Sequence, residues 1–186
     1  MKKLLINLII IFFLILSINL KAKENIMILK LKDGDVKIKL FSDVAPKHVE
    51  RIKKLADEGK YDNVVFHRVI DGFMAQTGDV KFGNSSSNDF DLKRAGTGGS
   101  SLPDLISEFN DMPHEKGTVS MARSSDPNSA NSRFFICFDS SPFLDRNYTV
   151  FGKVVEGMDH VDKIKKGDGT NGSVSDPDKI ISFKSQ

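Results

Sequence analysis

Hydrophobic and polar residues alternate in two neighbouring segments near the start of the chain, 26–32 and 35–41. Alternation with a period of two places apolar side chains on one face of a β-strand and polar side chains on the other. Asp33 and Gly34 lie between the segments, and this dipeptide is a strong signal for a tight turn between antiparallel strands. The sequence therefore predicts a β-hairpin over 26–41.

A helical pattern follows the hairpin. Pro46 suits the first helical position, where a missing N–H costs nothing, and Gly59 suits the end. Between them the apolar residues recur at helical spacing: Val49, Ile52, Leu55 and Ala56. These signals predict a helix that starts at Pro46 and stops at Gly59, with His48 in its first turn facing solvent.

A further alternating segment, 64–70, has an arginine among its apolar positions. One face of the predicted strand carries Val64, Phe66, Arg68 and Ile70. A guanidinium is always charged, so an arginine on an apolar face usually has a specific task. The ordinary alternative is a strand whose arginine pairs with a carboxylate. After a turn at Gly72 come an aromatic ring, a thioether and an amide: Phe73, Met74 and Gln76.

The rest of the chain predicts more strands and one more helix. Residues 80–95 are polar with little periodicity and indicate a loop, and the glycine cluster at 96–100 indicates a chain reversal, because it lacks the following lysine of a phosphate-binding loop. Strands are expected at 117–122, 133–138, 149–155 and 179–183, and a helix at 158–166 that stops at Gly167. Many short strands with two separate helices favour a closed antiparallel β-barrel over alternating parallel units.

The first 22 residues differ from the rest. Two lysines precede an apolar run from Leu4 to Leu20, and Lys21-Ala22 follows. This pattern is typical of a signal peptide, which leaves residues 23–186 as a single domain. The run approaches the length that spans a bilayer, and the exit is a poor match to a small-x-small cleavage site. An uncleaved inner-membrane anchor therefore stays open.

Charge and cysteine content narrow the function. Removing residues 1–22 takes away Lys2, Lys3 and Lys21 and no acid, so the formal charge falls by three, from +2 to −1. The domain has no excess of positive charge, which argues against nucleic acid as a partner. Cys137 is the single cysteine, so no intramolecular disulfide forms, and its apolar neighbours predict a buried side chain rather than a nucleophile.

Metal and hydrolytic chemistry have no support in the sequence. The four histidines show no metal-ligand spacing, and no serine lies in a nucleophile-elbow context. Residues 168–173 resemble a calcium loop only superficially, because the ligand spacing and the terminal glutamate are missing. They are interpreted as a turn-rich connection.

The segment Phe66-His67-Arg68-Val69-Ile70, with Phe73-Met74, Gln76 and Gly78-Asp79 after it, resembles the signature of the cyclophilin-type peptidyl-prolyl cis-trans isomerases. Further stretches match the same family in the same order: Gly96-Thr97-Gly98-Gly99, Gly117-Thr118-Val119-Ser120-Met121-Ala122-Arg123, Asp126-Pro127-Asn128-Ser129-Ala130-Asn131-Ser132, Phe134-Phe135-Ile136, Phe143-Leu144-Asp145, Val150-Phe151-Gly152-Lys153-Val154 and Gly157-Met158. The resemblance covers nearly everything after the first 22 residues and looks like the bacterial branch.

The resemblance implies a mainly β fold, a closed eight-stranded antiparallel β-barrel capped by two α-helices. It also implies an isomerase that rotates Xaa-Pro bonds in unfolded or extended polypeptides without cofactor or metal, as a monomer assisting protein folding in the periplasm. Two alternatives stay open. One is a proline-peptide-binding module with little or no catalysis, and the other is a membrane-tethered assembly factor.

Site residues follow from the same resemblance. Arg68, Phe73 and Gln76 are expected to be catalytic, with Gln76 steadying the arginine and the substrate carbonyl. The expected substrate-binding residues are Met74, Ala122, Arg123, Arg133, Phe135, Phe143, Leu144 and Tyr148. Phe143 stands where many relatives have tryptophan, so weak cyclosporin binding is expected.

Two features depart from the family pattern. Arg133 occupies a position where the family usually has glutamine, so a cation replaces a peptide-contacting amide and either weakens binding or favours acidic flanking residues. The segment 80–95 is much longer than the corresponding connection in relatives, and it is expected to select or restrict substrates beside the groove.

Overall fold

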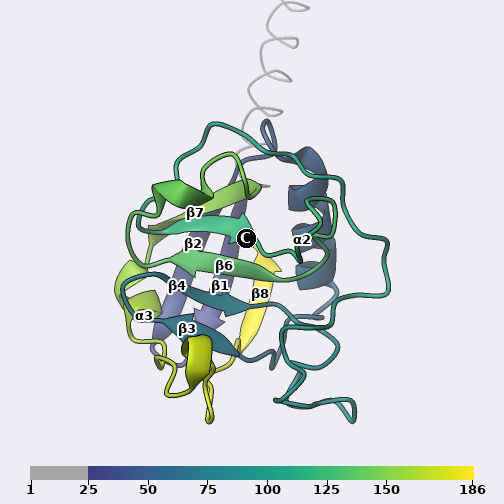
Figure 1. Ribbon diagram of the computed structural model, residues 1–186, viewed down its shortest axis with the longest axis vertical. Helices are drawn as coiled ribbons and strands as arrows, with labels where there is room; N and C mark the ends of the chain where they lie inside the picture. The colour runs from purple at the N-terminus through teal and green to yellow at the C-terminus, as the bar shows by residue number, and fades with distance from the viewer. Residues whose placement is uncertain (1–24) are drawn as a thin grey trace, which may run out of the picture.

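The computed structural model describes residues 25–186, so the predicted signal peptide at 1–22 lies outside the described residues. Within these residues the fold is mainly β, as expected, with eight strands and two α-helices (Figure 1). The strands are β1 (Ile26–Leu31), β2 (Gly34–Leu40), β3 (Arg68–Ile70), β4 (Met74–Thr77), β5 (Thr118–Met121), β6 (Phe134–Cys137), β7 (Val150–Glu156) and β8 (Ser182–Ser185). The helices are α2 (Pro46–Asp57) and α3 (Met158–Asp162), and short 3₁₀ turns cover Pro142–Leu144 and Thr170–Gly172. None of the described helices is long and apolar enough to cross a bilayer.

All eight strands form one antiparallel sheet in the order β3-β4-β6-β5-β7-β2-β1-β8. The sheet curls so that β1, β2 and β8 cross behind β3, β4 and β6 (Figure 1). Its two outer strands, β3 and β8, do not form a ladder with each other in the described part of the chain. The residues just before them join instead, through a single bridge between Val65 and Lys179. The prediction of a closed barrel is therefore correct in architecture but overstates the regular pairing across the seam.

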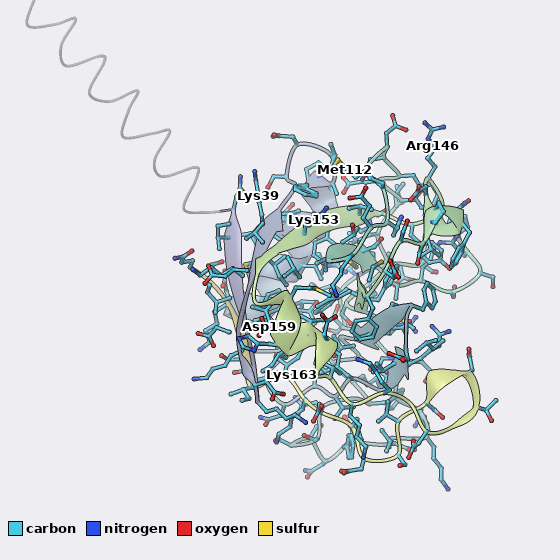
Figure 2. All side chains as sticks on the ribbon, turned by 90° about the vertical axis from the view of Figure 1, so that its left-hand side faces the viewer. Lys39, Met112, Arg146, Lys153, Asp159 and Lys163 are labelled. Carbon is cyan, nitrogen blue, oxygen red and sulfur yellow. The ribbon has the colours of Figure 1, made fainter. Side chains whose placement is uncertain are left out.

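The predicted hairpin is confirmed, with Leu31 opposite Gly34 at its tip. Side chains alternate along β2: Ile38 and Leu40 are buried, whereas Lys39 between them is exposed. Lys39 lies opposite Lys153 of β7 (Figure 2), and neither lysine contributes to the core. The period of two in the sequence thus separates the core face from the solvated face.

Aromatic side chains fill the centre of the barrel. Phe134 lies edge-on to Tyr61 with ring centroids 5.6 Å apart, and it also contacts Phe183 of the last strand. All three rings are fully buried. The Tyr61 hydroxyl donates a hydrogen bond of 2.8 Å to the main-chain oxygen of Ser132, so its one polar group is satisfied inside the core.

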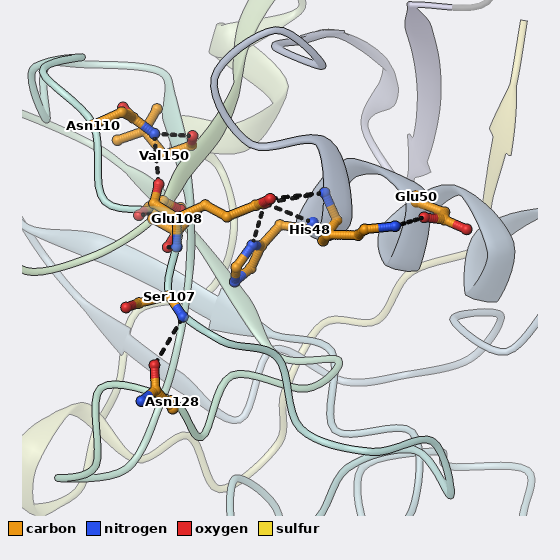
Figure 3. A network of polar contacts seen from close by, with 10 residues as sticks. His48, Glu50, Ser107, Glu108, Asn110, Asn128 and Val150 are labelled. Atoms are coloured by element: carbon orange, nitrogen blue, oxygen red, sulfur yellow. Dashed lines mark hydrogen bonds and ion pairs between the residues drawn. The ribbon is translucent and has the colours of Figure 1, made fainter.

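Helix α2 begins at Pro46 as predicted, and Gly59 adopts a left-handed conformation just after it ends. Its N-cap residue, Ala45, has no side chain that accepts a hydrogen bond, so the cap comes from elsewhere. The Glu108 carboxylate accepts hydrogen bonds from the main-chain N–H groups of Lys47 and His48 (Figure 3). A distant loop therefore supplies the negative charge that a helix N-terminus favours.

The prediction that His48 faces solvent is wrong, because this side chain is completely buried. Its Nδ1 lies 2.7 Å from Glu108 Oε2 (Figure 3), and burial lowers its pKa although Glu108 opposes the shift. His48 lies four residues before Ile52, so it shares the buried face of the helix. The loop that carries Glu108 covers this face, and the local sequence does not reveal that cover.

Two other elements differ from the predictions. Helix α3 ends at Asp162 rather than near Gly167, although Val161 and Ile164 both point inward as expected. The last strand, β8, begins at Ser182 and so lies later than the predicted 179–183. The predicted strand at 64–70 is regular only over β3, because the residues before it are held by single bridges to other segments.

The connection between β4 and β5 has no helix or strand, and the buried Asp79 carboxylate anchors it. One Asp79 oxygen accepts from the N–H groups of Lys81 and Phe82, and the other accepts from Gly96 and Gly98 at 2.7 and 2.8 Å. A Cβ at Gly98 would lie 2.6 Å from the same carboxylate, so glycine is required there. The predicted loop at 80–95 is confirmed, and its two ends meet at one buried side chain.

We expect Glu108→Ala to lower the free energy of unfolding by about 1 to 3 kcal/mol, because it removes the cap of α2 and leaves a buried histidine unpaired. Denaturant unfolding of the purified domain measures this. Glu50→Ala is the matched control: Glu50 forms an exposed ion pair with Lys47 on the same helix, and its loss is expected to cost less than about 0.5 kcal/mol. Equal effects of the two substitutions would contradict the capping role.

Candidate active site

A pocket of about 160 Å³ opens on the face of the sheet formed by β4 and β6. It is lined by Arg68, Phe73, Met74, Gln76, Ala122, Arg123, Phe135, Leu144 and Tyr148. These nine residues come from β3, β4 and the turn before it, β6, the segment that follows β5, the 3₁₀ turn and the connection from that turn to β7. All nine were expected at the site from the sequence, and two expected residues, Arg133 and Phe143, are not among the lining residues.

Strand alternation explains why the pocket and the barrel core share the same two strands. On β6, Phe134 and Ile136 belong to the main core, whereas Phe135 and Cys137 belong to a second buried cluster with Met74 of β4. Register then aligns the site, because Gln76 of β4 lies between Arg68 of β3 and Phe135 of β6. One face of each strand stabilises the barrel, and the other builds the pocket.

Asn171 holds the Arg68 guanidinium along one edge. Nε donates to the Asn171 main-chain oxygen and Nη2 donates to its side-chain oxygen, both at 3.0 Å. The remaining nitrogen, Nη1, lies 4.0 Å from the Met74 sulfur, at the pocket. Burial lowers the pKa of Arg68, which still leaves it charged at neutral pH. No carboxylate pairs with Arg68 among residues 25–186, so the alternative of an ordinary structural ion pair is not supported.

The sequence interpretation missed Asn171, which it assigned to a turn-rich connection. Asn171 adopts φ 56° and ψ 27°, a left-handed conformation that asparagine tolerates better than most residues. Gly172 follows it, and a Cβ there would lie 2.4 Å from an Ile70 side-chain carbon. A turn with Asn-Gly in this register is visible in the sequence, but its contact with Arg68, 103 positions away, is not.

Gln76 does not hold Arg68 through any hydrogen bond found in the described residues. Its amide lies 3.1 Å from His67 Nε2, and the Gln76 NH₂ group donates to the neutral ring. His67 is buried under Gly96, and burial lowers its pKa to about 4. The hydrogen bonds therefore do not follow the expectation that Gln76 steadies Arg68. Asn171 holds the arginine, and His67 holds the glutamine.

Arg133 and Phe143 border the pocket rather than line it. Phe143 is 67 % exposed, and its ring centroid lies 5.5 Å from that of Phe73. Arg133 donates a hydrogen bond to the main-chain oxygen of Gly96, in the long connection. Phe143 thus lies against a lining residue of the pocket, and Arg133 lies against a lining residue of a hollow beside it.

A buried polar network supports the wall of the pocket from behind. The His114 ring stacks on Phe135 with a centroid separation of 6.1 Å, and Nδ1 lies 2.9 Å from Asp145. Its other nitrogen lies 3.0 Å from the Ser120 hydroxyl. Although this resembles a serine–histidine–aspartate triad, Ser120 is fully buried and also donates to the Thr149 main-chain oxygen, so it has no access to a substrate. No local pattern of residues indicates this network.

The arrangement combines one fixed cation with an apolar slot. Cys137 is buried as predicted, and burial raises the pKa of its thiol to about 12, so it does not supply a thiolate. Phe73, Met74, Phe135 and Leu144 offer apolar surface, and Arg68 offers an oriented hydrogen-bond donor. Such a site binds a small apolar group and stabilises an acceptor that develops beside it.

Comparison with known proteins agrees with this arrangement. The family described as "Cyclophilin type peptidyl-prolyl cis-trans isomerase/CLD" matches residues 26–185. A "Probable peptidyl-prolyl cis-trans isomerase" of Brucella suis is 65% identical over 159 residues, which cover 85% of this chain and 81% of the relative.

Two solved structures have the same fold. The cyclophilin AquaCyp293 of Hirschia baltica is similar with a TM-score of 0.74 and 28% identity, over 88% of this chain and 74% of that one. A Cryptosporidium parvum cyclophilin-type isomerase, crystallised in the presence of the dipeptide Ala-Pro, is similar with a TM-score of 0.72 and 27% identity, over 87% of this chain and 98% of that one.

The buried His67 predicts a pH dependence of stability. Its pKa is about 4 in the folded protein against 6.5 for an exposed ring, so the unfolded chain binds a proton that the folded protein does not. The free energy of unfolding is expected to fall from pH 6.5 to pH 4, by on the order of 3 kcal/mol from this residue. Denaturant unfolding at several pH values measures the slope.

In His67→Asn, the slope of the free energy of unfolding against pH should become smaller over this range, by the amount that corresponds to about one bound proton. A residual slope is expected from His48 and His114, because burial also lowers their pKa values. An unchanged slope would show that His67 is not held neutral in the folded state.

Proposed function

The chain belongs to the cyclophilin-type peptidyl-prolyl cis-trans isomerases, and from that premise we propose that Arg68, oriented by Asn171, drives the rotation. The protein is an enzyme that interconverts the cis and trans forms of Xaa-Pro bonds. The single observation that carries the residue assignment is the orientation of Arg68, with one edge bound to Asn171 and Nη1 left at the pocket.

The chemical task is modest in size. Resonance in the peptide bond sets a barrier of about 20 kcal/mol, and uncatalysed exchange at proline takes tens to hundreds of seconds. Raising roughly 0.01 per second to a typical turnover of about 10 per second requires a thousandfold acceleration, or about 4 kcal/mol. Selective binding of the twisted state is enough to supply this.

Arg68 recognises a feature that only the twisted state has. When the bond rotates out of plane, resonance is lost and the proline nitrogen regains its lone pair. A charge-assisted hydrogen bond from Arg68 to that nitrogen contributes about 1.5 to 3 kcal/mol, and the planar ground state cannot accept it. Because Asn171 fixes the guanidinium beforehand, little reorganisation is needed when the lone pair develops.

The apolar pocket fixes the ring while the preceding carbonyl turns. Phe135 and Leu144 are almost fully buried, and the Tyr148 ring lies edge-on to Phe135 at 5.8 Å. The volume of about 160 Å³ suits a residue of the size of proline rather than a large side chain. Gln76, held by His67, is placed beside Arg68 on the neighbouring strand and serves the substrate carbonyl.

Proline-containing polypeptides are the natural substrates of this site, and the Ala-Pro dipeptide used with the Cryptosporidium parvum relative supports that class. The smaller Phe143 side chain, where many relatives have tryptophan, supports weak cyclosporin binding. We also propose that the enzyme acts as a monomer on unfolded chains in the periplasm. The support for the periplasmic location is the charged and then apolar pattern of residues 1–22.

Arg68→Ala is expected to lower kcat/KM for Xaa-Pro isomerisation by about 10- to 100-fold without unfolding the domain, because it removes the charge-assisted bond. Exchange NMR on a short proline peptide measures the rate. Asn171→Gly keeps the left-handed backbone and the main-chain acceptor but loses the side-chain acceptor, so a smaller loss, mainly in kcat, is expected. Wild-type rates in Arg68→Ala would refute the assignment.

The location in the cell is tested by fractionation of the producing bacterium with mass spectrometry of the mature amino terminus. We expect a soluble periplasmic protein that has lost residues 1–22, and a variant lacking residues 2–22 should stay in the cytoplasm. A full-length chain released only by detergent would favour the membrane anchor instead.

A further inference from the structure

Three arginines lie in or beside the pocket, and none of them forms an ion pair with an acidic side chain within residues 25–186. Arg68 and Arg123 line the pocket. Arg133 lies next to it, because its main-chain oxygen accepts a hydrogen bond from the N–H of Ala122, a lining residue. Every hydrogen bond found from the three guanidinium groups to oxygen goes to a neutral acceptor.

The linings of the pocket and of the hollow beside it, which has a volume of about 220 Å³, carry no acidic side chain. The hollow shares Arg68 and Gln76 with the pocket and reaches the long connection at Gly96. A polypeptide lying across both therefore meets several positive charges, although the whole domain carries almost no net charge.

The three arginines differ in how many donors are free. Arg123 uses its donors on the main-chain oxygens of Asn147, Ser124 and Ser125, and its guanidinium carbon lies 4.6 Å from the Tyr148 ring centroid. Arg123 is therefore fixed as part of the pocket wall. Arg68 is committed to Asn171 and to the reaction itself.

Arg133 has one hydrogen bond, to Gly96, among the contacts of the described residues. A guanidinium has five N–H donors in a planar fork, so most of those of Arg133 remain available. Gly96 is also a lining residue of the hollow, so Arg133 contacts the edge of a hollow that Gln76 and Arg68 line as well. The buried His67 interacts electrostatically with both Arg133 and Arg68, and each positive charge contributes to lowering the pKa of the His67 ring.

Two carboxylates lie within electrostatic reach of Arg133 without binding it. Burial lowers the pKa of Arg133, and Asp79 and Asp104 oppose this shift. Asp79 is fully buried and already accepts four main-chain N–H groups, and Asp104 accepts from the Asn131 side chain at 2.9 Å. Arg133 stays charged, as a guanidinium does at neutral pH, and neither carboxylate accepts a hydrogen bond from it, so its fork remains open to an external acceptor.

We propose that Arg133 gives the enzyme a preference for substrates with aspartate or glutamate close to the isomerised proline. This rests on the proposed function, because the arginine acts on a chain already seated in the proline pocket. A carboxylate accepts two parallel N–H bonds from a guanidinium, which an amide or a lysine side chain of the substrate cannot do. Arg133 is a specificity-determining residue, distinct from the group that drives rotation.

The test uses short alanine-based peptides with one proline. In separate peptides, glutamate, glutamine or lysine occupies either the position before the proline or the position after it. Exchange NMR gives kcat/KM for the wild-type domain, and titration with the slowed Arg68→Ala variant gives Kd. We expect glutamate to be preferred over glutamine by about three- to tenfold in at least one position, and 0.5 M salt to narrow the preference.

Arg133→Gln is the decisive variant, because a glutamine still donates to Gly96 but carries no charge. It should reduce the preference to less than about twofold, with an unchanged melting temperature as the check on folding. Arg133→Lys keeps the charge without the fork and should retain part of the preference. Arg94→Gln is the matched control. Arg94 lies on the connection between β4 and β5 that also carries Gly96, but its guanidinium packs against the Phe82 ring, and it is not a lining residue of the pocket.

Equal rates for glutamate and glutamine at every position, or a preference that survives in Arg133→Gln, would overturn the proposal. A preference lost equally in Arg94→Gln would also overturn it, because net charge would then be the cause. These outcomes are separate from a failure of the catalytic assignment. Normal turnover in Arg68→Ala would refute the catalytic assignment of Arg68. The preference for glutamate would still be tested by the Kd values, by comparing proteins with and without the Arg133→Gln substitution.

Discussion

The site depends on the pair of hydrogen bonds between the Arg68 guanidinium and Asn171. Without them a long, flexible cation beside an apolar pocket would turn toward solvent, where its charge is better hydrated. The two acceptors of Asn171 engage one edge of the guanidinium and leave the other edge at the pocket. The rate acceleration of the family requires only a few kilocalories per mole, so a fixed direction matters more here than additional catalytic groups.

The same strands serve two apolar clusters. Phe134 and Ile136 of β6 face the barrel core, and Phe135 and Cys137 face the pocket. This arrangement makes the pocket rigid, because any movement of its wall would also disturb the core. The stack of His114 on Phe135 adds support from the side of Asp145. The pocket is therefore preorganised by packing, and its apolar lining needs no separate scaffold.

The irregular part of the molecule is held by two carboxylates, those of Asp79 and Glu108, instead of regular hydrogen-bond ladders. Asp79 gathers four N–H groups from the two ends of the long connection, and Glu108 joins the next loop to the first turn of α2. A single carboxylate accepts several hydrogen bonds, so it replaces local secondary structure efficiently. This order brings Gly96, and with it Arg133, to the edge of the substrate site.

Much of this protein follows from the sequence alone, and the rest required the tertiary structure. The period of two, the Asp33-Gly34 turn and the Pro46 to Gly59 signals predicted the hairpin and α2, because such patterns depend on residues close together in the chain. All nine residues that line the pocket were expected there from the resemblance to the family. The fold decided three features: the burial of His48, the contact between the neutral His67 ring and Gln76, and the hydrogen bonds from Arg68 to Asn171. Each depends on a partner from a distant segment, and a local pattern specifies which face a side chain takes but not what will cover it.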